Sequence, residues 1–131
     1  MSEGQVALPD GFSVGHWSDP EGLTGCTVVI PPSEEGAAGV FVAGGGPGTR
    51  ETDILSPLSR AEGASAVLLT GGSAFGLAAA DGVARWLEQH ERGHWTPAGL
   101  VPIVPAAVIY DLASGDPKAR PGPEQGYAAC E

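Results

Sequence analysis

The sequence predicts an α/β fold in a single domain that spans residues 1–131. Three short apolar runs, at residues 26–30, 66–69 and 106–110, have the length and composition of strands. Residues 74–92 repeat apolar side chains at three- and four-residue spacing, which indicates an amphipathic helix. Gly and Pro contribute 21 and 12 residues without a regular period, so the chain is loop-rich and not collagen-like.

The charge and composition of the chain exclude several classes of protein. Sixteen acidic and six basic residues give a formal net charge of −10, so the surface would repel nucleic acids and anionic membranes. Hydrophobic residues make up 42% of the chain, which is enough for a core and too much for a disordered acidic tail. No apolar run reaches the length of a membrane span, and no secretory signal is recognisable. Two cysteines make no disulfide framework, so a reducing, cytoplasmic setting is expected.

The N-terminal part is expected to contain one antiparallel pair of strands. Residues 1–22 are polar and rich in Gly, Pro and Asp, and no strand is assigned to them. The strand at residues 26–30 ends at a Pro-Pro pair, a turn follows at 33–36, and residues 39–43 form a second short strand. The two strands are close enough in the chain to pair with each other.

A Gly-rich loop, a buried strand and the long helix follow in that order. Residues 43–53 cannot form regular structure, whereas residues 66–69 form a buried strand. Ser73 is the expected N-cap of the helix, and Gly93 stands where a C-terminal glycine belongs. The apolar stripe of the helix consists of Phe75, Ala79, Val83, Trp86 and Leu87.

The C-terminal part is predicted to hold one more strand and the start of a helix. Within the apolar block at 100–112, which two prolines interrupt, residues 106–110 are the best strand. Turns follow at 116–118 and 121–123, and residues 124–131 look like the first turns of a helix. Because the chain ends on this apolar, helix-prone run, we expect it to be one piece of a longer polypeptide.

Residues 90–94, His-Glu-Arg-Gly-His, match the H-E-x-x-H pattern of zinc metallopeptidases. That chemistry needs both histidines on one helical face as ligands, with the glutamate as general base. Here Gly93 lies inside the pattern at the predicted end of the helix, and no obvious third ligand follows. A solvated helix end is therefore the favoured interpretation, and zinc binding through His90, Glu91 and His94 is the alternative.

The turn Gly71-Gly72-Ser73, which connects the second strand to the helix, has three interpretations. It fails the G-x-S-x-G pattern of a nucleophile elbow because Phe75 occupies the last position. Ser73 as a helix cap alone is the first interpretation. In the second, exposed backbone N–H groups line a pocket for an anion or a carbonyl oxygen. A nucleophilic Ser73 is the third and least favoured.

The glycines at 44–48 form neither a P-loop nor a dinucleotide-binding turn, because the required residues and spacing are missing. Arg50, Glu51 and Asp53 beside this loop are expected to form a local ion-pair and capping cluster. Ligand binding by Arg50 is the minority alternative.

Tyr110 closes the third strand and is followed by Asp111. Most tyrosines in such a position are core residues with a satisfied hydroxyl, and the residues alone favour that interpretation. A tyrosine at a strand end beside a pocket can also donate a hydrogen bond to an oxyanion. Cys26 and Cys130 are expected to be small buried hydrophobes.

Four blocks of sequence stand out as a set. They are Gly-Cys-Thr-Val at 25–28, Gly-Gly-Gly-Pro-Gly-Thr-Arg-Glu-Thr-Asp at 44–53, Leu-Thr-Gly-Gly-Ser-Ala-Phe-Gly-Leu at 69–77 and Pro-Ala-Ala-Val-Ile-Tyr-Asp at 105–111. In this order, and over about residues 15–131, the chain resembles the self-processing L-aminopeptidase D-Ala-esterase/amidase family (peptidase family S58). That family includes β-peptidyl aminopeptidases and nylon-oligomer hydrolases. The block at 44–53 is the most specific of the four.

The resemblance implies a four-layer αββα sandwich of the N-terminal-nucleophile-hydrolase type, with this chain as part of the α subunit. Such proteins cleave their own chain before a Ser or Thr, which then attacks an amide bond and forms an acyl-enzyme, its own amine acting as base. The implied partners are a β chain that carries this nucleophile, further αβ units in a homo-oligomer, and a small peptide or amide substrate. No cofactor or metal is implied.

Within this chain, the resemblance gives Tyr110 a catalytic role, because the family's tyrosine hydroxyl points at the reacting carbonyl. It also places Gly71, Gly72 and Ser73 in the loop that lines the substrate pocket. The nucleophile, the cleavage site and the oxyanion asparagine are expected beyond Glu131, so this chain alone would have no peptidase activity.

One departure from the family pattern concerns the substrate. The aminopeptidase branch tends to have Glu two residues before the tyrosine, where this chain has Val108. This favours a substrate whose amine is absent, distant or held by other groups, as in the nylon-oligomer branch. Three alternatives stay open: the zinc metallopeptidase, an acyltransferase of the related ornithine acetyltransferase type, and a catalytically silent binding subunit.

Overall fold

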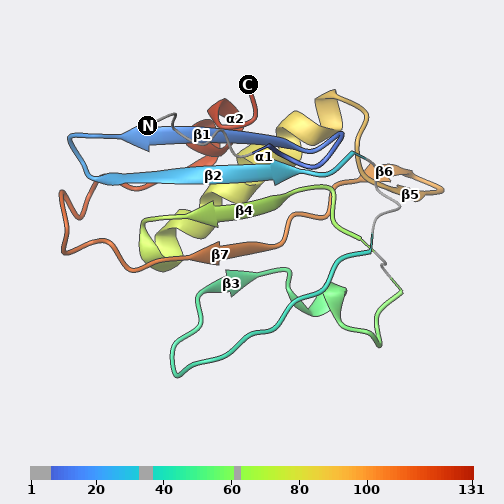
Figure 1. Ribbon diagram of the computed structural model, residues 1–131, viewed down its shortest axis with the longest axis horizontal. Helices are drawn as coiled ribbons and strands as arrows, with labels where there is room; N and C mark the ends of the chain where they lie inside the picture. The colour runs from blue at the N-terminus through green and yellow to red at the C-terminus, as the bar shows by residue number, and fades with distance from the viewer. Residues whose placement is uncertain (1–6, 33–36, 61–62) are drawn as a thin grey trace.

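A five-stranded mixed sheet forms the centre of the computed structural model, which describes residues 7–32, 37–60 and 63–131 (Figure 1). Its strands run in the order β1-β2-β4-β7-β3. They are β1 (Ser13–Asp19), β2 (Thr24–Ile30), β3 (Thr49–Arg50), β4 (Val67–Thr70) and β7 (Ala106–Val108). β4 and β7 are parallel, and the other neighbouring strands are antiparallel. The predicted α/β class is confirmed.

A helical connection joins the parallel strands β4 and β7, as parallel pairing requires. It begins with the 3₁₀-helix η2 (Ser73–Ala78), which continues into α1 (Ala79–Gln89). A separate two-stranded hairpin, β5 (His94–Thr96) and β6 (Gly99–Val101), follows before β7. Neither strand of this hairpin was predicted.

The core lies between the sheet and the helices, which cover one face of the sheet (Figure 1). Alternate residues of the strands point into it, as the two-residue period of a strand requires. Val28 and Leu68 are fully buried there against Val83 and Leu87 of α1. Cys26 belongs to this core with 4% of its surface exposed, whereas Cys130 is only partly buried beside it. The predicted strands at 26–30 and 66–69 are therefore confirmed in type and place.

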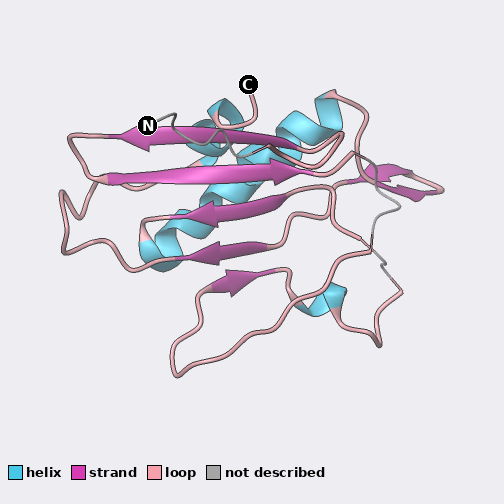
Figure 2. Cartoon of the chain, in the orientation of Figure 1, coloured by secondary structure: helices cyan, strands magenta, loops and turns pink. Residues whose placement is uncertain are grey.

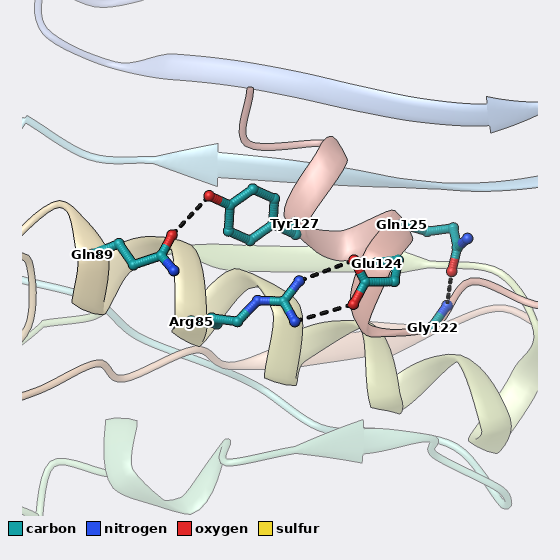
Figure 3. Close-up of polar contacts among 6 residues, drawn as sticks. All are labelled: Arg85, Gln89, Gly122, Glu124, Gln125 and Tyr127. Carbon is teal, nitrogen blue, oxygen red and sulfur yellow. Dashed lines mark hydrogen bonds and ion pairs between the residues drawn. The ribbon is translucent and has the colours of Figure 1, made fainter.

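A second helix, α2 (Pro123–Ala128), packs directly on α1 and confirms the helix predicted near the end of the chain. Two glycines allow this approach: a Cβ at Gly82 would overlap the Pro123 carbonyl oxygen, and one at Gly126 would overlap that of Ala79. Figure 3 shows the polar contacts near the place where α1 and α2 meet. Arg85 binds both carboxylate oxygens of Glu124 at 3.0 and 3.1 Å, the Tyr127 hydroxyl donates to Gln89 at 2.7 Å, and the Gln125 side chain accepts from the Gly122 N–H at 2.9 Å.

The strand partner predicted for β2 was wrong. β1 fills that place, in a segment where no strand was assigned, and pairs with β2 over all seven residues. The pattern of β1 is concealed because Gly15 and Trp17 face α2 while the polar His16 faces away and bonds Thr27 at 2.8 Å. Residues 39–43 form no strand. Figure 2 shows them in the long loop that leads to β3, and Phe41 is 91% exposed. The predicted turn at 33–36 lies outside the described residues.

Both predicted helix caps were also wrong. Ser73 has a positive φ of 53° and its side chain makes no cap hydrogen bond, because the chain enters the helix through a left-handed turn at Gly72. The helix ends at Gln89, and the left-handed residue that follows is Glu91, with φ 54°. Gly93 instead lies against β6, where a Cβ would be 2.8 Å from the carbonyl carbon of Val101.

Three smaller differences concern the edges of predicted elements. The loop at 43–53 contains the two-residue strand β3 and the start of the 3₁₀-helix η1 (Asp53–Leu55), so it is not wholly irregular. β7 ends at Val108, two residues earlier than predicted. In the apolar stripe of the helix, Phe75 lies on the exposed side because η2 is 3₁₀ and not α. Among the described residues, no helix combines the length and apolar composition needed to cross a membrane.

Candidate active site

Two loops meet at the edge of the sheet where β4 and β7 end. Because these strands are parallel, their carboxyl ends lie together, which is the usual place for a binding site in an α/β sheet. The Ile109 N–H donates to the Thr70 carbonyl at 2.9 Å, and the Ser73 N–H donates to the Ile109 carbonyl at 3.0 Å. The turn at 71–73 is thus joined directly to the segment that carries Tyr110.

Asp111 fastens the same two loops through its side chain. One carboxylate oxygen accepts a hydrogen bond from the Gly72 N–H at 2.7 Å, and the other accepts from the Thr24 hydroxyl at 2.7 Å. Burial raises the pKa of the Asp111 carboxyl, but the hydrogen bonds from Thr24 and Gly72 outweigh it and leave that pKa below its ordinary value. The carboxylate is therefore ionised and held at neutral pH.

The glycines of the turn are required by this arrangement. A Cβ at Gly71 would overlap both the Asp111 carboxylate and the Thr24 hydroxyl, so no larger residue fits. Gly72 has φ 80°, a conformation that side-chain-bearing residues rarely adopt. The turn follows from the sequence Gly-Gly at the end of a buried strand.

Tyr110 is not a core residue: its side chain is 74% exposed, which corrects the interpretation that the residues alone favoured. It lies between Ile109 and Asp111, both of which are hydrogen-bonded to neighbouring loops. Its own hydroxyl has no hydrogen-bond partner in the part of the chain that the structure describes. A phenol held this way is free to donate to a ligand.

An open hollow of about 690 Å³ lies beside this edge of the sheet. Of the four residues proposed from the sequence, only Gly71 lines it; Gly72, Ser73 and Tyr110 lie outside its lining. Its polar lining residues include Thr24, Thr70 and Asp111. The apolar part of its wall comes from residues that include Trp17, Leu23, Leu69, Val108 and Ile109.

The histidine motif does not have the geometry of a zinc site. The helix ends at Gln89, so His90 is its C-cap and its ring stacks on Trp86 with centroids 3.7 Å apart. His94 lies on β5, off the helix as expected. In residues 7–32, 37–60 and 63–131, no group of three or more His, Cys, Asp or Glu residues could hold a metal ion.

The acidic and basic residues of the Gly-rich block do not form the expected local cluster. Arg50 reaches across to α1 and pairs with Asp81 at 2.7 Å. The Glu51 carboxylate accepts a hydrogen bond from the Val104 N–H at 2.9 Å. The prediction failed because Arg50 and Glu51 find partners more than 25 residues away, which the sequence pattern does not indicate.

Sequence reasoning missed Asp111 and Thr24 as parts of this site. Asp111 had one signal, its position next to Tyr110 after an apolar strand. Thr24 had none, because it precedes the β-branched run of β2 and meets Asp111 only through the pairing of β2 with β4.

Comparisons with known proteins now place the chain. The family model described as peptidase family S58 matches residues 9–128. A protein named an uncharacterized aminopeptidase in Mycobacterium leprae is 54% identical, over 92% of this chain and 35% of its own length. Similarly named proteins of Mycobacterium bovis and Mycobacterium tuberculosis are 51% identical, over 92% of this chain and 37% of theirs. The chain thus spans about a third of the length of these relatives. Since the family model covers most of its length, the chain belongs to peptidase family S58.

Proposed function

We propose that this chain is the N-terminal part of an autoprocessed hydrolase that cleaves amide bonds with an N-terminal Ser or Thr nucleophile. Membership of a peptidase family and the aminopeptidase names of its relatives support hydrolysis of peptide or related amide bonds. One observation most directly supports a catalytic role for this chain. The phenol of Tyr110 is exposed beside the glycine turn at 71–73, which backbone hydrogen bonds hold in place.

In this proposal, Tyr110 donates a hydrogen bond to the oxyanion that forms when the amide carbonyl is attacked. Such a donor is worth most when it is held in place before the reaction begins. Gly71, Gly72 and Ser73 form one wall of the substrate pocket. Val108, which lines the neighbouring hollow, offers no charge to a substrate ammonium group. The substrate amine is therefore absent, distant or held by other groups.

The nucleophile belongs to a second chain, the β chain, that self-cleavage would release. Its hydroxyl oxygen attacks the amide carbon while its own amino group takes the proton. The leaving amine departs with that proton and an acyl-enzyme remains. Water then attacks the ester carbon, the bond to the nucleophile's oxygen breaks, the acyl group leaves as a carboxylic acid, and a proton from the water restores the hydroxyl of the nucleophile. No cofactor takes part in these steps.

The face of the sheet away from α1 and α2, here called the open face, supports a four-layer αββα sandwich. Val29, Val67, Leu69 and Ala107 alternate with the core residues of their strands, so they lie on this face. Leu69 is 51% exposed there. Packing of a second sheet on this face would bury it, and the relatives have the additional length to supply one.

The further partners in this proposal are other αβ units in a homo-oligomer and a small peptide or amide as substrate. The assembly would work in the cytoplasm. There the thiols of Cys26 and Cys130, which are free in this structure, would stay reduced.

The first experiment is intact-mass and N-terminal analysis of the complete natural polypeptide, followed by assay on aminoacyl anilides and on oligomers of 6-aminohexanoate. We expect two chains, the second beginning with Ser or Thr, and release of the amine. An uncleaved chain that hydrolyses neither substrate would overturn the proposal. Loss of activity with a chelator would favour zinc, and product that needs an added amine would favour an acyltransferase.

A further inference from the structure

We propose that Asp111 is the positioning residue of this site: with Thr24, it fixes the backbone around Tyr110 so that the phenol meets the reacting carbonyl. The inference rests on the proposed function, because it assigns Asp111 a role in the same reaction. It concerns a residue that acts on the position of Tyr110 and not on the reacting carbonyl.

The first observation is that both oxygens of the Asp111 carboxylate are used, and by different parts of the fold. Gly72 lies in the turn that follows β4, and Thr24 lies at the start of β2. Both donor–acceptor distances are 2.7 Å, as is usual for hydrogen bonds to an ionised acceptor. The carboxylate therefore joins the start of β2, the end of β4 and the segment after β7 at one point.

The second observation is that Tyr110 is held on both sides in the chain. Ile109 uses its N–H on the Thr70 carbonyl and its carbonyl on the Ser73 N–H. Asp111 is held through its side chain, and its carbonyl accepts a hydrogen bond from the Ser114 N–H at 2.8 Å. Between these two fixed residues, the backbone of Tyr110 has little freedom.

The third observation is that the Tyr110 side chain has no such restraint of its own. It is 74% exposed, and the described residues offer its hydroxyl no hydrogen bond. Its placement thus depends on the backbone that carries it. An error of about 1 Å in the position of a catalytic group can cost on the order of 100-fold in rate. Releasing Asp111 should therefore slow the reaction although the Tyr110 hydroxyl itself is still present.

The shape of Asp111 matters in this account more than its charge. Asparagine has the same shape and keeps an oxygen that accepts from the Gly72 N–H. Its side-chain NH₂ group can donate a hydrogen bond to the Thr24 hydroxyl oxygen. Alanine keeps neither contact. Similarly, Thr24→Ser keeps the hydroxyl that Asp111 needs, whereas Thr24→Val keeps the size and loses the donor.

The test uses the complete natural polypeptide and measures kcat and KM separately for these four variants. We expect Asp111→Ala to lower kcat about 30-fold or more and Thr24→Val about 10-fold, with KM within about threefold of the unaltered protein. Asp111→Asn and Thr24→Ser should each stay within about fivefold in kcat. Asp116→Ala is the matched control: Asp116 also accepts a backbone N–H in a turn, from Lys118 at 2.8 Å, and kcat should not change.

Two kinetic results would overturn the inference. Equal losses in Asp111→Asn and Asp111→Ala would mean that the negative charge acts, not the position. Unchanged kcat in Asp111→Ala, with only a lower melting temperature, would mean that the contact is structural. If Asp111→Ala fails to fold, the Thr24 pair decides, because Thr24→Val removes one hydrogen bond and leaves Asp111 in place.

A second readout separates this inference from the proposed function. With 3-fluorotyrosine incorporated, the ¹⁹F signal that disappears in Tyr110→Phe reports the order of that ring. We expect it to shift toward the value of free fluorotyrosine in Asp111→Ala and Thr24→Val, and to stay in place in Asp111→Asn and Thr24→Ser. If the unaltered protein hydrolyses no amide, the proposed function fails while this pattern still supports the positioning role. A Tyr110 signal that none of the variants moves would overturn that role.

Discussion

The layer of helices and the edge of the sheet around Tyr110 differ in how completely their side chains are used within the chain. Where α1 meets α2, two glycines bring the backbones into contact, and Arg85, Glu124, Gln89 and Tyr127 pair with one another (Figure 3). At the ends of β4 and β7, backbone hydrogen bonds hold Ile109 and Asp111, but the side chains of Ile109 and Tyr110 are left exposed.

Glycine and tyrosine therefore have different structural roles in the two regions. Glycine brings helices together in one and shapes a turn around a carboxylate in the other. Of the two tyrosines of the chain, Tyr127 bonds within the helix layer, and Tyr110 extends from a rigid backbone. We infer that the helix layer supplies stability and that the sheet edge supplies chemistry. Each region can be altered separately to test this division.

The largest effect is expected from Gly82→Ala at the contact between the helices. In an isolated helix this change would stabilise by about 1 kcal/mol. Here the added Cβ would overlap the Pro123 carbonyl oxygen, which cannot move without displacing α2. We expect a net loss of about 3 kcal/mol in the free energy of unfolding, measured by urea denaturation of the complete polypeptide.

The control for this change is Gly45→Ala in the Gly-rich loop. A Cβ at Gly45 would meet no atom within 4 Å, so the free energy of unfolding should change by less than about 0.5 kcal/mol. If Gly82→Ala were neutral or stabilising, the helix layer would not be closely packed. The inference that this layer supplies stability would then be wrong.

The two tyrosines provide the second prediction. Tyr110→Phe should lower kcat/KM about 100-fold, equivalent to about 2.7 kcal/mol, because it removes the proposed donor to the oxyanion. Its free energy of unfolding should stay within about 0.5 kcal/mol, since the hydroxyl bonds nothing among the described residues. Tyr127→Phe loses the bond to Gln89 and should do the reverse: it should cost about 0.5–1 kcal/mol of stability and leave kcat/KM unchanged. Equal effects of the two changes on activity would contradict the division.

The sequence predicts those parts of the fold where a local pattern and the final burial agree. Val28, Leu68 and Leu87 are apolar residues at strand or helix spacing, and each is fully buried in the core. The turn at 71–73 was also found, because Gly-Gly after a buried strand has few other uses. Its hydrogen bonds to the segment that carries Tyr110 were not predicted.

The remaining features depend on contacts that no local pattern records. β1 is a strand because β2 offers a full register of partners, although its own residues alternate weakly. Residues 39–43 have the apolar composition of a strand and lack a partner. Instead Val40 and Phe41 line a hollow of about 360 Å³ against Leu69 of the open face. The Asp111–Thr24 bond joins residues 87 positions apart, so only the sheet topology could reveal it.

The third prediction compares the acidic groups of the two regions as the pH falls. The pKa of Asp111 is lowered by hydrogen bonds despite burial, and that of Glu124 by its bond and ion pair with Arg85. A carboxylate with a lowered pKa contributes stability above its unfolded value, about 3.9 for Asp, and loses it as the pH falls through the folded value. The stability advantage of the unaltered protein over Asp111→Asn should therefore be constant from about pH 5 to 7 and shrink below about pH 4.

High salt distinguishes the two causes of a lowered pKa, which are a hydrogen-bonded ion pair for Glu124 and hydrogen bonds for Asp111. The Arg85–Glu124 pair lies at the surface, so the advantage over Glu124→Gln should fall in about 1 M NaCl. The advantage over Asp111→Asn should persist, because short hydrogen bonds from Thr24 and Gly72 cause it. An Asp111 contribution that disappears in salt, or that grows on acidification, would show that the carboxylate is not held as described.

The smallest effect is expected where the two regions meet. Arg50 of β3 pairs with Asp81 of α1 at 2.7 Å, with side chains 39% and 59% exposed. Exposed ion pairs contribute about 0.2–1 kcal/mol, so a double-mutant cycle of Arg50→Met and Asp81→Asn should give a coupling free energy of about 0.5 kcal/mol. A coupling above about 2 kcal/mol, or a change of more than threefold in kcat for Asp81→Asn, would mean that the helix layer controls the sheet edge through this pair. Near-zero coupling would leave the shared sheet as their connection, through the backbone pairing of β7 with β3 and β4.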